Sequence, residues 1–175
     1  MSILEDAYLP TDEELTTQEV NLSGPVLKAA AFHYGNACLA ENNEFMLCRT
    51  ETNDPRACIK EGKAVTNCAL NFFRQVKKSC SAEFMQYYNC IDKSSTDQAY
   101  SPCRKTQAVF DKCMKDNLNI ERAPFDYFAR VQVHKTNRPR PLEEPIPHYP
   151  NTPVALPEDA PKPPAKYGSR YLGLW

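Results

Sequence analysis

A chain of 175 residues with a net charge of −1 exerts no long-range attraction on nucleic acid or anionic lipid. No uninterrupted apolar stretch approaches the roughly 18 residues that a membrane span requires, so no span is expected. The core should be small for this length, because ten of the 15 prolines fall between residues 139 and 164.

Residues 1–22 are predicted to form an N-terminal arm. Its first residues carry Glu5 and Asp6 and no basic residue, unlike a secretory signal or an Arg-rich mitochondrial presequence. Thr11 followed by Glu14 fits a capping box, which predicts a short helical turn. Two interpretations of the arm stay open: a flexible segment, and a strand that docks on another surface.

Residues 23–78 are predicted to form a helix followed by a first helical hairpin. Ser23 is expected to cap the helix, and Gly35 to loosen its end. His33 invites a metal-binding or proton-transfer role. No partner stands near it in the sequence, so we interpret it as a packed or interfacial histidine.

Within this hairpin, Asn42 and its neighbour Asn43 are expected to interrupt or delay the first helix. Asp54 before Pro55 predicts the start of the second helix, about 22 residues long. Phe73 lies beside the apolar stripe of that helix and is expected to be exposed. The stripe recurs at steps of four and three residues and comprises Cys58, Gly62, Val65, Ala69, Phe72 and Val76.

Residues 79–118 are predicted to form a second hairpin with a polar loop from Ser94 to Tyr100. Ser101 before Pro102 is expected to cap its last helix. The cationic pair Arg104–Lys105 stands in the first helical turn, where the helix dipole favours anions. Contact with an acidic partner or a lipid phosphate is one interpretation of this pair, and a solvated helix start is the other.

Residues 119–175 are predicted to form an extended, proline-rich tail, in which residues 138–165 lie close to polyproline II and have no core of their own. Aromatic and apolar residues gather near residues 167–175. Flexible linkers rarely carry such residues. We therefore interpret the tail as a strap lying across a partner surface, in preference to free disorder.

The cysteines determine the predicted fold. They form four Cys-x9-Cys segments, and an α-helix of that length places its two cysteines about 15 Å apart on roughly one side. A disulfide requires Cα atoms within about 7 Å, so no bridge forms inside one helix. The short connections favour antiparallel helices. The predicted bridges are nested: Cys38–Cys68 with Cys48–Cys58, and Cys80–Cys113 with Cys90–Cys103.

The same spacing argues against metal and redox chemistry. Zinc sites use short Cys-x2–4-Cys clips, and the chain has none. It also lacks a Cys-x-x-Cys redox pair, a haem attachment motif and adjacent cysteines for Cu(I). We expect no catalytic residue, no cofactor and no metal, and an all-α fold of two disulfide-stapled hairpins with extended arms.

The chain resembles the twin CHCH fold, and more specifically the double-CHCH accessory subunits of mitochondrial NADH:ubiquinone oxidoreductase, respiratory complex I. The resemblance covers residues 9–118 and scattered tail positions. It departs from the pattern in the x12 spacing between Cys90 and Cys103 and in most of the tail. The segments that carry it include Val26–Ala31, His33–Gly35, Glu44–Arg49, Asp54–Arg56, Cys68–Leu70, Phe72–Gln75, Cys90–Asp92, Cys103–Lys105 and Gly168–Arg170.

The resemblance implies a non-catalytic subunit on the intermembrane-space face of the membrane arm. Its expected partners are other membrane-arm subunits, the import oxidase transiently, and phospholipid head groups, but no nucleic acid. Two other classes stay open. One is a soluble assembly factor or metallochaperone of the same compartment, and the other is a thiol oxidoreductase.

Overall fold

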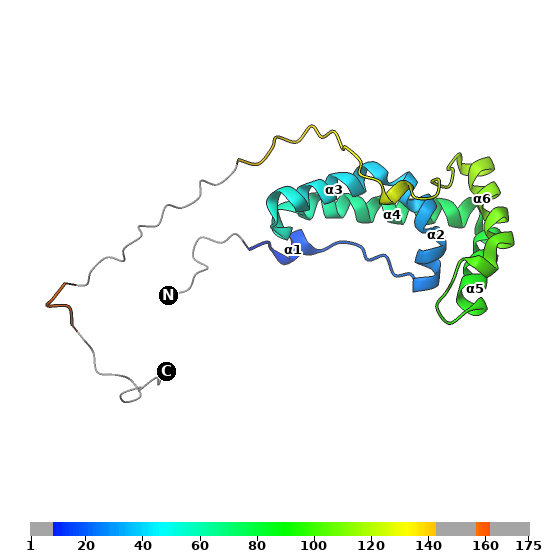
Figure 1. Cartoon of the computed structure of the whole chain (residues 1–175), viewed down its shortest axis with the longest axis horizontal. Helices are drawn as coiled ribbons and strands as arrows, with labels where there is room; N and C mark the ends of the chain where they lie inside the picture. The colour runs from blue at the N-terminus through cyan, green and yellow to red at the C-terminus, as the bar shows by residue number, and fades with distance from the viewer. Residues whose placement is uncertain (1–8, 143–156, 162–175) are drawn as a thin grey trace, which may run out of the picture. The chain divides into compact units, whose positions relative to one another are not determined.

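A computed structural model describes residues 9–142 and 157–161 of the chain. The chain divides into two compact units, Met1–Pro141 and Leu142–Trp175. In the described residues every regular element is helical, which confirms the all-α prediction (Figure 1). None of the helices described there is long and apolar enough to cross a membrane.

The arm carries helix α1 (Asp12–Leu15), which begins with the predicted capping box. The Glu14 backbone N–H donates to Thr11 Oγ1 at 3.3 Å, and the Thr11 N–H donates to Glu14 Oε2 at 2.9 Å. These two bonds satisfy donors that a helix start otherwise leaves unpaired. The predicted helical turn after Pro10 is therefore present.

Helix α2 (Gly24–Ala37) continues without a break through Gly35, so the prediction that Gly35 loosens its end is wrong. The ring of Phe128 lies over this position, and a Cβ at Gly35 would stand 2.7 Å from Phe128 Cζ. Glycine here provides space for the ring. Ser23 stands at the N-cap, but its side chain makes no capping hydrogen bond.

Helix α3 (Leu39–Thr52) is continuous, so Asn42 and Asn43 do not interrupt it. Asn42 Nδ2 donates to the carbonyl of Cys38 at 2.7 Å, which ties the amide into the first turn. The break lies earlier, at Cys38, whose φ of −109° separates α2 from α3.

Asp54 caps the next helix as predicted, because its Oδ1 accepts from the Arg56 N–H at 2.9 Å. The first turn is a 3-10 helix, Pro55–Cys58, and α4 (Ile59–Ser79) follows directly. Figure 1 shows α3 and α4 lying side by side as a hairpin.

The second hairpin begins where Cys80 separates α4 from α5 (Ser81–Ser94). A polar loop leads to a short 3-10 helix, Ser101–Cys103, and then to α6 (Arg104–Leu118). The predicted Ser101 cap is wrong, because Tyr100 holds the N-cap position. The Tyr100 hydroxyl instead donates to the carbonyl of Lys28 at 3.0 Å and fixes the loop to α2.

The main core lies between α2, the C-terminal half of α4, α5 and α6. Helix α2 packs on α5, so the two hairpins share one core. The first hairpin has little buried core near its turn, since the only buried residue of α3 is Cys48. The buried members of the core are Ala29, Ala30, Cys38, Phe72, Val76, Cys80, Phe84, Tyr87, Ile91, Cys103, Phe110 and Met114.

After α6 the chain passes through Asn119, which has a left-handed φ of 54°, into an extended segment with one 3-10 turn at Tyr127–Ala129. In the second unit, the described residues form a turn in which the Ala160 N–H donates to the carbonyl of Pro157 at 3.0 Å. The predictions for residues 143–156 and 162–175, including the aromatic strap, lie outside the described residues.

Candidate structural site: bridges, a buried histidine and a docked segment

The structure brings together the two sulfurs of each predicted cysteine pair. One bridge in each hairpin lies near the turn and one near the open end, and their Cα–Cα distances of 5.8–6.0 Å fall in the usual range for disulfides. No cysteine is free. The bridges are Cys38–Cys68, Cys48–Cys58, Cys80–Cys113 and Cys90–Cys103.

These bridges also bear on metal binding. In the described residues, one group of three potential ligands is close enough to share an ion: Cys38, Glu41 and Cys68. The two sulfurs in this group are bonded to each other, so they offer no thiolate while the bridge is intact. The chemistry of this group is therefore that of a structural bridge.

Aromatic rings fill the space inside the second hairpin. The Phe110 ring lies 5.0 Å from that of Phe84 and 5.9 Å from that of Tyr87, and all three are buried. The second hairpin therefore has an aromatic centre between its two bridges.

His33 is fully buried on α2, where it packs edge-on against Phe110 with ring centroids 5.0 Å apart. Its Nε2 lies 3.2 Å from Asp111 Oδ1 of α6, without hydrogen-bond alignment to any described residue. Arg122 Nη1 stands 3.6 Å from the same oxygen, and the guanidinium covers the Phe32 ring at 4.1 Å. The interpretation of His33 as a packed histidine is correct.

Burial lowers the pKa of His33 to about 4, because a charged imidazole would lose its hydration. Asp111 opposes this shift and Arg122 adds to it. The imidazole is therefore neutral at pH 7. It packs between α2 and α6, beside Arg122 of the segment that follows α6, without adding a charge to the core.

We expect the free energy of unfolding to fall as the pH drops from 6.5 toward 4. In that window the unfolded chain binds a proton at His33 and the folded chain does not, which costs the fold on the order of 3 kcal/mol. Urea unfolding of the wild type and of His33→Gln at several pH values measures the effect, which the variant should lack. An NMR titration midpoint for His33 near 6.5 would refute this expectation.

A second polar site fastens the extended segment after residue 130 onto α3. Glu44 accepts hydrogen bonds from His134 at 2.7 Å, Thr136 at 2.9 Å and Arg138 at 3.1 Å. Arg138 also donates to Glu51 at 2.8 Å. The hydrogen bond from His134, followed by those from Thr136 and Arg138, lowers the pKa of Glu44.

The residues that donate hydrogen bonds to Glu44 occupy every second position of the segment. This spacing is expected for an extended backbone, in which successive side chains point to opposite sides. Just before these donors, Val131 and Val133 are 100% and 90% exposed. Sequence reasoning missed this site. Valine alternates with polar residues over 131–134, which indicates an extended segment. Nothing local identifies Glu44, which lies 90 residues from His134, as its acceptor.

We expect Glu44→Gln to release residues 134–138 from α3, because a neutral amide has one acceptor oxygen and cannot replace a carboxylate that accepts three charge-assisted hydrogen bonds. Proteolytic cleavage after Lys135 should become roughly three- to tenfold faster, while the helical content stays the same. Glu51→Gln is the matched control, since it weakens only the one hydrogen bond from Arg138 and should have a smaller effect. Equal cleavage rates in both variants would argue against the role of Glu44.

The fold and the bridges define a class: a small helical protein made of two disulfide-stapled hairpins that share one core. No protein-family model matches the chain. It is 32% identical over 87 residues to NADH dehydrogenase [ubiquinone] 1 alpha subcomplex subunit 8-B of Arabidopsis thaliana, covering 50% of this chain and 80% of that protein. Subunit 8-A of the same plant is also 32% identical, with 79% of its length covered.

A fungal relative matches a longer part of the chain. The NADH-ubiquinone oxidoreductase 20.8 kDa subunit of Neurospora crassa is 30% identical over 122 residues, 69% of this chain and 66% of that protein, just under two thirds. The chain belongs to the family of NADH dehydrogenase [ubiquinone] 1 alpha subcomplex subunit 8.

Proposed function

We propose that the chain is a non-catalytic accessory subunit of mitochondrial complex I, of the twin CHCH type, that braces the complex and supports its assembly. The observation that carries this proposal is the match to named subunits of NADH dehydrogenase over about four fifths of their length. Other subunits of the complex are then the partners of this chain.

The bracing role is mechanical. Four bridges hold the hairpins together. Each stabilises the fold by roughly 2–4 kcal/mol, because it lowers the conformational entropy of the unfolded chain. The segment after α6 is fastened to α3 through Glu44, and its exposed valines face away from the hairpin. Rigid helices with docked extended segments suit a protein that spans neighbouring subunits. The proposed division of the chain is 1–22 arm, 23–78 first hairpin with its preceding helix, 79–118 second hairpin and 119–175 tail.

We place the subunit on the intermembrane-space side of the inner membrane. Disulfides persist in oxidising compartments, and all eight cysteines are paired in the structure. The four pairs would form during import, in transient contact with the import oxidase. Arg104 and Lys105, both exposed at the start of α6, are the proposed contacts for phospholipid phosphates.

An affinity-tagged full chain tests the proposal. After solubilisation of mitochondrial membranes in mild detergent, we expect the chain to migrate on native gels with NADH dehydrogenase activity. A tagged chain found only as a soluble species apart from that activity would exclude the subunit role and favour an assembly factor. Protease added after rupture of the outer membrane should degrade the chain, and protease added to intact mitochondria should not.

A further inference from the structure

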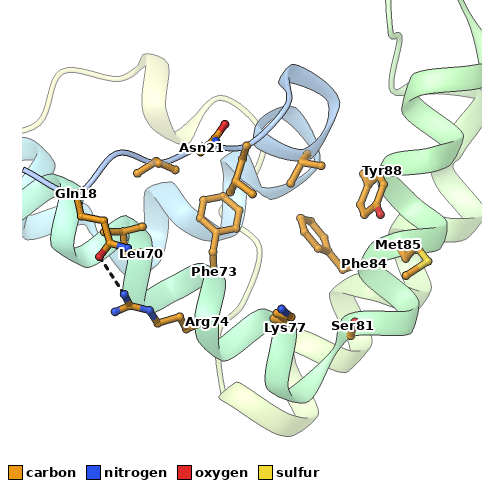
Figure 2. Close-up of a pocket in the computed structure, with 13 residues that line it drawn as sticks. Gln18, Asn21, Leu70, Phe73, Arg74, Lys77, Ser81, Phe84, Met85 and Tyr88 are labelled. Atoms are coloured by element: carbon orange, nitrogen blue, oxygen red, sulfur yellow. Dashed lines mark hydrogen bonds between the residues drawn. The ribbon is translucent and has the colours of Figure 1, made fainter.

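An apolar groove of about 460 Å³ opens between the N-terminal arm and helices α4 and α5. Figure 2 shows the rings of Phe73, Phe84 and Tyr88 around this space, with Met85 at its edge on α5. The opposite wall is formed by four residues of the arm: Gln18, Val20, Asn21 and Leu22. Phe73, expected to be exposed, is half-buried here, so the side chain beside the stripe of α4 lines the groove.

The rim of the groove is cationic. Arg74 and Lys77 stand along the α4 edge (Figure 2), and among the described residues no Asp or Glu lines the groove. Arg74 donates to Gln18 at 3.2 Å and to Asn71 at 3.2 Å, both neutral. The salt bridges seen among the described residues involve neither cation. Two positive charges beside an apolar floor complement an apolar ligand that carries a negative charge.

The groove remains open although the arm lies along it. Met85 is 48% exposed and Leu22 is 37% exposed, so apolar surface faces solvent on both walls. Aromatic residues, Met and Arg are the residue types enriched at the centres of protein interfaces, where they supply most of the binding energy. This composition favours a protein segment over a lipid chain as the occupant.

We propose that the groove receives an apolar segment of a neighbouring subunit and that a carboxylate of that segment pairs with Arg74 and Lys77. The apolar side chains of the segment pack on Phe73, Met85 and Tyr88, and its Asp or Glu lies at the α4 rim. This inference rests on the proposed function, because the neighbour is another subunit of the same complex.

A photo-cross-linking amino acid at Met85, in the full chain within the purified complex, tests the site directly. The expected product joins Met85 to a peptide of another subunit that contains apolar residues and at least one Asp or Glu. The same probe at Val109, 50% exposed on α6, is the matched control and should not give this product. A Met85 product with lipid alone, with residues 119–175 of the same chain, or with a peptide lacking an acidic residue would overturn the proposal.

Charge reversal tests the ionic part. In the Met85-probe background, Arg74→Glu with Lys77→Glu should lower the yield of the cross-link about tenfold, because attraction becomes like-charge repulsion. Lys112→Glu, an exposed reversal on α6, should leave the yield unchanged. An unchanged yield in the double variant would overturn the pairing. A chain absent from the complex in the Val109 control would refute the proposed function, whereas an assembled chain without the Met85 product refutes only the groove.

Discussion

Replacing both Cys80 and Cys113 with alanine is expected to lower the free energy of unfolding by about 4 kcal/mol. This bridge joins residues 33 positions apart, and its loss frees a long loop in the unfolded chain. Cys80 is also fully buried in the main core. Urea unfolding under non-reducing conditions, followed by circular dichroism, measures the change.

The matched control removes the Cys48–Cys58 bridge, which closes a loop of only 10 positions at the turn of the first hairpin, outside the main core. The same chain-entropy relation gives about 3 kcal/mol for this bridge. Because these residues lie outside the main core cluster, hydrogen exchange should increase mainly near residues 48–58. If the Cys80/Cys113 variant lost less than about 1 kcal/mol, the helices would not depend on their bridges.

The second large effect is expected for Phe110→Ala. This ring is fully buried and contacts the rings of His33, Phe84 and Tyr87, so it joins three helices. Removal of a buried phenylalanine leaves a cavity and costs about 3–5 kcal/mol. Thermal or urea unfolding of the oxidised protein measures the loss.

Val109→Ala is its control, since Val109 precedes Phe110 on α6 but is half exposed. We expect a change within about 0.5 kcal/mol for this variant. Similar losses in the two variants would show that the second hairpin has no well-packed centre. Together with the cysteine variants, this pair separates the contribution of packing from that of the bridges.

The fold followed from the sequence because its constraints are local. A Cys-x9-Cys interval has a fixed length on a helix, and short connections leave antiparallel pairing as the favoured arrangement. The capping box at Thr11 and the Asp54–Pro55 start also depend on neighbouring residues only, and both are present. Ser101 failed as a cap because Tyr100 and Lys28 fix the loop through a contact distant in sequence.

The rest of the site depends on contacts between residues far apart in the chain. His33 was identified as packed, but its partners Asp111 and Arg122 come from α6 and the segment beyond it. Gly35 was interpreted as a glycine that loosens a helix end. Its actual role is to make room for the ring of Phe128, and no pattern near Gly35 in the sequence indicates that contact. Such contacts are set by how the helices pack, which one sequence does not reveal.

The pairing of the eight cysteines in the native protein is the basis of both the fold and the proposed role. Non-reducing proteolytic mapping of the chain from purified complex measures this pairing directly by mass spectrometry. We expect four linked peptide pairs, with no free thiol and no exchange under mild reductant: Cys38–Cys68, Cys48–Cys58, Cys80–Cys113 and Cys90–Cys103. Free thiols at these positions, or a metal ion bound in place of the bridges, would contradict the account.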